Sequence, residues 1–98
     1  MIIVTGTLHA RADTLAEVLA LSREHVARSR AEPGCIEHGV AIDVDDPMRL
    51  VFFGRWADQA AIGAHLKVPA SREFGKRVAA LVDRPPTLEM YDASELKR

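Results

Sequence analysis

The 98-residue chain has one cysteine, one tryptophan, one tyrosine and no asparagine. Because Cys35 is the only cysteine, the chain cannot form an internal disulfide, and its sequence neighbours give no sign of a reactive thiol. With 13 basic and 14 acidic residues the net charge is −1, so the composition does not favour nucleic acid or an anionic membrane as a partner. The apolar start, residues 1–4, is too short for a signal peptide or a membrane span, and we expect a cytoplasmic protein.

The chain also lacks the short motifs that bind nucleotides or metal ions. It contains no GxGxxG, no GxxxxGK[ST], no cysteine pair, and no group of histidine and acidic residues at metal-ligand spacing. From these absences we expect no bound cofactor and no metal ion.

Four segments have the pattern of β-strands. Residues 2–9 alternate between two faces, as a half-buried strand does. Two runs of β-forming residues, 35–44 and 48–56, lie on either side of Asp45-Asp46-Pro47, which favours a turn. Residues 87–91 predict a fourth strand, and the last residues, from 92 or 93 to 98, a polar tail.

A first helix is predicted after residue 13. Asp13 or Thr14 is suited to its N-cap, and Thr14 and Glu17 have the spacing of a capping box. The residues expected to face inward are Leu15, Val18, Leu19, Ser22 and Val26.

A second helical region is predicted after the third strand. Asp58 is expected to cap a short helix that carries His65, and Pro69 to break or kink it. A further helix follows, with Phe74, Val78, Leu81 and Val82 expected to face inward.

The order β-α-β-β-α-β predicts an α+β, ferredoxin-like domain over residues 1–98, with a core over 2–92 and a four-stranded antiparallel sheet. Two helical segments can cover only one face of such a sheet. The third strand nevertheless places Val51 and Phe53, or else Leu50 and Phe52, on the uncovered face. An exposed apolar patch of this kind is typical of an interface, so we expect a homodimer through the sheet face.

Several motifs, in order and at matching spacing, resemble the antibiotic biosynthesis monooxygenase domain. They are Glu32-Pro33-Gly34-Cys35, Asp46-Pro47, Arg55-Trp56-Ala57-Asp58, and Ala64-His65-Leu66 with Pro69 following. The resemblance covers about residues 2–92 and implies the dimeric α+β barrel of a family that includes quinol and anthrone monooxygenases. The same scaffold also carries haem-degrading enzymes and proteins without established chemistry.

The chain departs from this family at several positions. Gly54 stands where the family often has glutamate, His38 where it often has tyrosine, and Ala70 where it often has a second histidine. Haem-degrading relatives and some polyketide monooxygenase relatives rely on an asparagine, which this chain lacks, so their mechanisms cannot be transferred intact. Trp56 and His65 remain matched.

The resemblance implies oxygenation by O₂, without a bound cofactor, of a small aromatic quinol-like, anthrone-like or polyketide-like substrate. Two interpretations of each candidate residue stay open. His65 is either the catalytic base or a hydrogen-bonded core histidine, and Trp56 either stacks on the substrate or belongs to the core. His38, on an otherwise apolar strand face, needs a partner or a cavity, and Phe52 is expected to form cavity wall. The alternative function is a non-catalytic ligand-binding or accessory domain.

Overall fold

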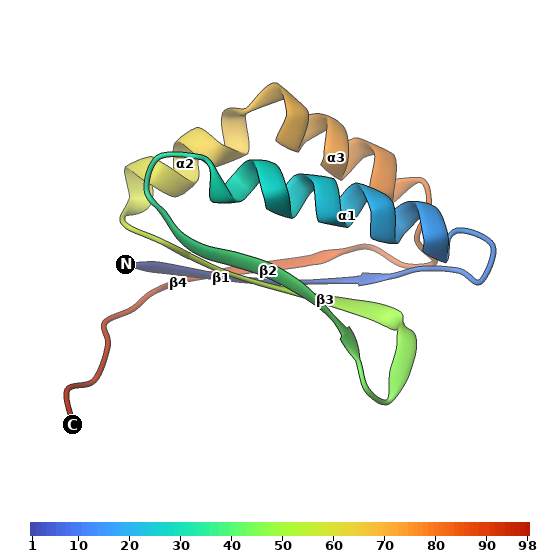
Figure 1. The fold of residues 1–98 in the computed structure, drawn as a ribbon, viewed down its shortest axis with the longest axis horizontal. Helices are drawn as coiled ribbons and strands as arrows, with labels where there is room; N and C mark the ends of the chain where they lie inside the picture. The colour runs from blue at the N-terminus through green and yellow to red at the C-terminus, as the bar shows by residue number, and fades with distance from the viewer.

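The computed structural model describes residues 1–98 as a four-stranded antiparallel sheet with three helices on one face (Figure 1). The strands have the order β2-β3-β1-β4, and each neighbouring pair is antiparallel. This is the predicted α+β, ferredoxin-like fold. Along the chain the elements are β1 (Ile2–His9), α1 (Leu15–Arg30), β2 (Cys35–Asp43), β3 (Asp46–Trp56), α2 (Gln59–Lys67), α3 (Pro69–Ala79) and β4 (Thr87–Asp92).

The break between α2 and α3 follows from Pro69. A residue before proline avoids the helical conformation, and Val68 is accordingly extended, with φ −62° and ψ 125°. Pro69 then occupies the first turn of α3, where its missing N–H leaves no bond unmade. At the other end of α2 the predicted cap is present, because Asp58 accepts a hydrogen bond from the Ala61 N–H at 2.8 Å. Leu81 and Val82 lie beyond the end of α3 and still pack against the core.

The turn between β2 and β3 lies earlier than predicted. Asp43 pairs with Asp46, so the loop consists of Val44 and Asp45, and Asp46-Pro47 begins β3. The side chain of Asp43 accepts a hydrogen bond from the Asp45 N–H at 2.9 Å, which starts the turn at that point. The prediction of a turn over Asp45-Asp46-Pro47 is therefore wrong.

The predicted capping box at the start of α1 is also absent. Thr14 makes no side-chain cap. Its hydroxyl accepts a hydrogen bond from the Arg11 N–H at 3.0 Å and donates one to the Leu81 carbonyl at 2.7 Å. Glu17 instead lies 3.6 Å from Arg77 of α3. The threonine thus ties the start of α1 to the segment after α3, which the local spacing of Thr14 and Glu17 could not indicate.

The strand register decides which side chains face the helices. Leu8 pairs with Leu50 and Ile2 with Trp56, and all four are buried beneath the helical layer. They belong to two core clusters: Leu8, Ala10, Val18, Leu21, Leu50 and Val78 form one, and Ile2, Trp56 and Ile62 form the other. Alternation then places Val51 and Phe53 on the opposite face, where Phe53 is 41% exposed.

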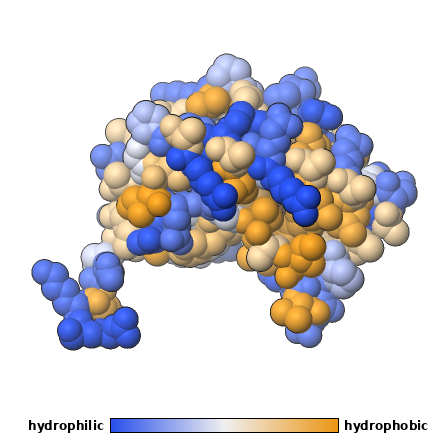
Figure 2. Space-filling view, viewed as in Figure 1, coloured by the Kyte–Doolittle hydropathy of each residue, from blue (hydrophilic) through white to orange (hydrophobic).

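The ends of the domain lie together at one edge of the sheet (Figure 1). The amino group of Met1 donates to the Ala93 carbonyl at 3.0 Å, and the Ala93 N–H donates to the Met1 carbonyl at 2.9 Å. The tail after Ala93 then extends away from the sheet. Apolar surface is also visible at the projecting end of the β2–β3 hairpin (Figure 2), where Val44 is 98% exposed. None of the helices has both the length and the apolar character needed to cross a membrane.

Candidate functional site

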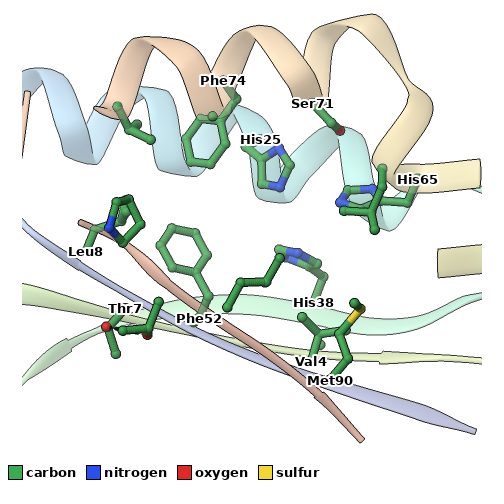
Figure 3. Close-up of a pocket in the computed structure, with 18 of the residues that line it drawn as sticks. Val4, Thr7, Leu8, His25, His38, Phe52, His65, Ser71, Phe74 and Met90 are labelled. Carbon is green, nitrogen blue, oxygen red and sulfur yellow. Dashed lines mark hydrogen bonds between the residues drawn. The ribbon is translucent and has the colours of Figure 1, made fainter. Parts of the chain in front are cut away.

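A cavity of about 320 Å³ lies between the sheet and the helical layer (Figure 3). Phe52 and Phe74 face each other across one part of it, with ring centroids 6.2 Å apart. Leu88 and Met90 of β4 also line the cavity and stay 59% and 50% exposed, so the cavity opens on the β4 side. Its volume falls at the lower end of the range for small-molecule sites, about 300–1,000 Å³.

Three of the four histidines meet in the wall of this cavity. His25 comes from α1, His38 from β2 and His65 from α2. Their ring centroids lie 5.4 Å (His25 to His38), 5.3 Å (His25 to His65) and 6.0 Å (His38 to His65) apart. The cavity therefore combines apolar walls with one polar group of imidazoles.

His25 lies in the inward stripe of α1. The buried residues of this helix are Val18, Leu21, Ser22, His25, Val26 and Ser29. The imidazole stacks on Phe74 of α3, with centroids 4.2 Å apart and planes only 7° from parallel. Its Nδ1 is buried without a hydrogen-bond partner. Burial, reinforced by the neighbouring His38, His65 and Arg28, lowers the pKa of His25 to about 3, so the ring is neutral near pH 7.

His38 enters the cavity from the sheet. It pairs with Gly54 of β3, whose missing side chain leaves room for the imidazole. Burial, together with His65 and Arg30, lowers the pKa of His38 to about 4. Its Nδ1, like that of His25, has no hydrogen-bond partner. An unsatisfied buried polar group typically costs about 1–3 kcal/mol, so both rings sit in an energetically unfavourable environment.

His65 has a hydrogen-bond partner. Its Nδ1 lies 2.9 Å from Oε1 of Glu32, in the loop between α1 and β2. The two side chains are only 7% and 18% exposed, respectively. A carboxylate at this distance holds the proton on Nδ1 and leaves Nε2 as the atom that can accept a proton or bind a ligand.

Of the four predicted site residues, His65, His38 and Phe52 line the cavity. Trp56 does not. Its side chain is 1% exposed and packs with Ile2 and Ile62, because its strand position points into the core beneath α2. The expectation that the tryptophan borders the cavity is therefore wrong. The ring instead supports His65, with centroids 4.6 Å apart, and meets His38 edge-on at 6.3 Å.

Two residues of the site were not predicted from the sequence. His25 could have been found, because it lies three or four residues from Leu21, Ser22 and Ser29 on the inward face of α1. Glu32 belongs to a loop motif, and no local pattern indicates that its carboxylate reaches a histidine 33 residues further along the chain.

Comparisons with known proteins agree on one family. The family model described as antibiotic biosynthesis monooxygenase matches residues 1–77. An uncharacterised protein of Synechocystis sp. is 31% identical over 94 residues, which cover 96% of this chain and 64% of that protein.

Solved structures give the same result. A crystal structure of an antibiotic biosynthesis monooxygenase superimposes with a TM-score of 0.89 at 27% identity, covering 97% of this chain and 100% of the other. A protein of Deinococcus radiodurans, provisionally named an antibiotic biosynthesis monooxygenase, superimposes with a TM-score of 0.94 at 26% identity, covering 100% of this chain and 97% of the other.

Proposed function

The chain belongs to the antibiotic biosynthesis monooxygenase family, and we propose that it oxygenates a small aromatic quinol-like, anthrone-like or polyketide-like molecule in the cavity between sheet and helices. In this proposal O₂ is the second substrate and no cofactor takes part. His65 is the catalytic base, Phe52 and His38 contact the substrate, and Trp56 holds the two histidines from the core side.

The His65–Glu32 pair is the observation that carries this proposal. An apolar cavity with few polar groups suits a flat aromatic ligand. A carboxylate 2.9 Å from Nδ1 orients the imidazole and stabilises the imidazolium that forms when Nε2 accepts a proton. A positioned base of this kind contributes roughly 10²–10⁴-fold to the rate.

The reaction is balanced without an added reductant. Nε2 of His65 takes a proton from the activated carbon or hydroxyl of the substrate, and the resulting anion gives one electron to O₂. The two radicals combine to a hydroperoxide, which loses water and leaves a carbonyl. For a methylene substrate, one oxygen atom enters the product and the other leaves as water, so the carbon supplies all four electrons that O₂ needs. The apolar walls exclude bulk water from this sequence.

Oxygen uptake tests the proposal. The purified protein, treated with a chelator and free of flavin, is mixed with an anthrone or a hydroquinone, and uptake is compared with autoxidation in buffer. We expect the wild type to exceed the blank, and His65→Gln to lose at least 100-fold of the enzymatic rate. Glu32→Gln is expected to lose about 10-fold or more, because the amide orients the ring without stabilising its positive charge. His9→Ala, which changes the histidine outside the cavity, is the control.

The alternative function is a non-catalytic ligand-binding or accessory domain. The glycine at position 54 and the histidine at position 38, which replace residues common in the family, support it. A wild type that binds such aromatic compounds with micromolar affinity but does not exceed the autoxidation rate would establish this alternative. A protein that neither binds nor oxygenates them would reject the substrate class.

We also propose that two copies pair through the sheet face that the helices leave open. On this face Phe53 is 41% exposed, and Tyr91 of β4 is 49% exposed. An apolar patch on an otherwise polar small domain is typical of an interface, and two-fold pairs are the commonest assembly of soluble chains.

A further inference from the structure

We propose that His25, His38 and His65 form a binding site for a divalent transition-metal ion, with one coordination position open to the cavity. This site goes beyond the proposed oxygenation, because metal binding does not require that the protein is an enzyme. It also differs from the expectation drawn from the sequence, in which no group of residues had metal-ligand spacing.

The distances nearly fit a metal centre. One ring nitrogen of each histidine lies within 4.8 Å of the other two. A point equidistant from three atoms at that separation is at most about 2.8 Å from each, whereas zinc binds imidazole nitrogen at about 2.0–2.1 Å. Each ring therefore moves by less than about 1 Å on binding. Figure 3 shows His25 reaching from the helical layer toward the sheet, and His38 reaching from the sheet toward the helices.

The state of the imidazoles supports the same site. Only 7% of His25 is exposed, yet its Nδ1 has no hydrogen-bond partner, and Nδ1 of His38 is in the same state. Nearly all buried polar atoms in folded proteins have a partner, so two unpaired imidazoles side by side require an explanation. A metal ion bound by neutral imidazoles supplies one.

The third histidine has the support that metal ligands usually have. Glu32 holds Nδ1 of His65 at 2.9 Å, which leaves Nε2 as its ligand atom. Carboxylate–histidine–metal arrangements of this kind fix the ring and raise its basicity. Three histidines and an open position are also the ligand set of catalytic zinc sites.

The donor atoms define the class of ion. Imidazole nitrogen suits zinc, copper and nickel, whereas magnesium and calcium prefer oxygen ligands. Arg28 and Arg30 add positive charge near the cluster. Arg28 is paired with Glu24 at 3.2 Å, and the Glu32 carboxylate offsets one further charge. We therefore expect a borderline divalent ion, for which Zn²⁺ is the probe.

Zinc titration of the chelator-treated full chain, prepared without a histidine tag, tests the site. We expect one Zn²⁺ per chain with submicromolar affinity, measured by competition with a chromophoric chelator. His25→Phe, His38→Tyr and His65→Gln should each weaken binding by at least 100-fold, and Glu32→Gln by about 10–100-fold. His9→Ala should leave the affinity unchanged, since this histidine lies outside the cluster.

A second measurement needs no variant and so does not depend on how the substituted proteins fold. In ¹⁵N-edited NMR of the histidine rings, equimolar Zn²⁺ should shift the signals of three histidines and leave His9 unaffected. Failure to bind stoichiometric Zn²⁺, or binding that survives all three substitutions, would overturn the proposal. Both readouts are independent of oxygen uptake, so the metal site and the proposed oxygenation can fail separately. If both are correct, Zn²⁺ should inhibit oxygenation, because it occupies Nε2 of His65.

Discussion

Gly54 and His38 are cross-strand partners in the β2–β3 ladder, and a Cβ atom at position 54 would lie 3.3 Å from Cδ2 of His38. The same Cβ would lie 3.3 Å from Nε1 of Trp56. Two departures from the family pattern, glycine at 54 and histidine at 38, therefore meet in space. The imidazole of His38 uses room that a larger residue at position 54 would take.

The first prediction concerns this pair. Gly54→Ala should lower the free energy of unfolding by about 1–3 kcal/mol, measured by urea denaturation, because both contacts are tighter than normal packing allows. Gly39→Ala is the matched control in the neighbouring strand, where an added Cβ would meet nothing within 4 Å. Replacing His38 with alanine should remove part of the cost. If Gly54→Ala costs the same with and without His38, the two positions are not coupled.

The second prediction is a loss of stability at mildly acidic pH in the metal-free protein. In the unfolded chain a histidine titrates at about 6.5, whereas folding lowers the pKa of His25 to about 3. Between these values the unfolded state binds more protons, so the free energy of unfolding falls as the pH falls below about 6.5. His25 alone should account for up to about 2 kcal/mol between pH 7 and pH 5. The lowered pKa of His38 acts in the same direction.

Carboxylates titrate in part of the same range, so the comparison must be with a variant that removes only the histidine. His25→Phe keeps a ring against Phe74 and cannot take up a proton. Its unfolding free energy, measured in urea at several pH values with chelator present, should depend less on pH than that of the wild type. Parallel pH profiles for the two proteins would contradict the assignment to His25.

Position 34 provides the third prediction. Gly34 has φ +82°, and a Cβ there would lie 2.5 Å from Cβ of Ala61 in α2. Gly34→Ala should therefore lower the free energy of unfolding by about 2–4 kcal/mol, through backbone strain and overlap with α2. The control is Gly63→Ala in α2, where an added Cβ meets nothing within 4 Å. That substitution should instead stabilise the protein, by about 0.5–1 kcal/mol, because alanine favours a helix interior.

The fourth prediction tests the pairing of two chains. Light scattering at micromolar concentration should give about twice the mass of one chain. Phe53→Asp should shift the mass to that of a monomer or unfold the protein, since it places a charge on the open sheet face. Val44→Asp at the hairpin tip, equally apolar but 98% exposed, should change neither mass nor stability. A wild type that stays monomeric at this concentration would contradict the dimer.

The sequence predicted the order of the elements because hydrophobic alternation and turn residues are local signals. It could not predict how helices at different heights bring side chains together. His65 and His38 were found as isolated candidates, each with its own element, while His25 lies in an amphipathic helix where a histidine reads as one polar residue among others. Contacts such as His65 to Glu32, or Thr14 to the Leu81 carbonyl, join residues 33 and 67 positions apart and leave no periodic trace.

Trp56 illustrates the same limit in the other direction. Its place at the end of β3 predicted correctly that it lies near His65. Whether its ring faces the cavity or the core depends on the position of α2, whose Ile62 covers the indole. The strand pattern alone contains no information on that helix.

The two hydrogen bonds between Met1 and Ala93 nearly close the backbone of the domain into a ring. A short linker from residue 93 to residue 1 would bridge neighbouring atoms, and new ends could be opened at the Val44-Asp45 turn, which projects beyond the helices. Such a circular permutant would keep every strand pairing and every histidine of the cavity wall. It would also place both new ends at the hairpin tip, on the side of β3 away from β1 and β4, as attachment points for fused proteins or surface anchors.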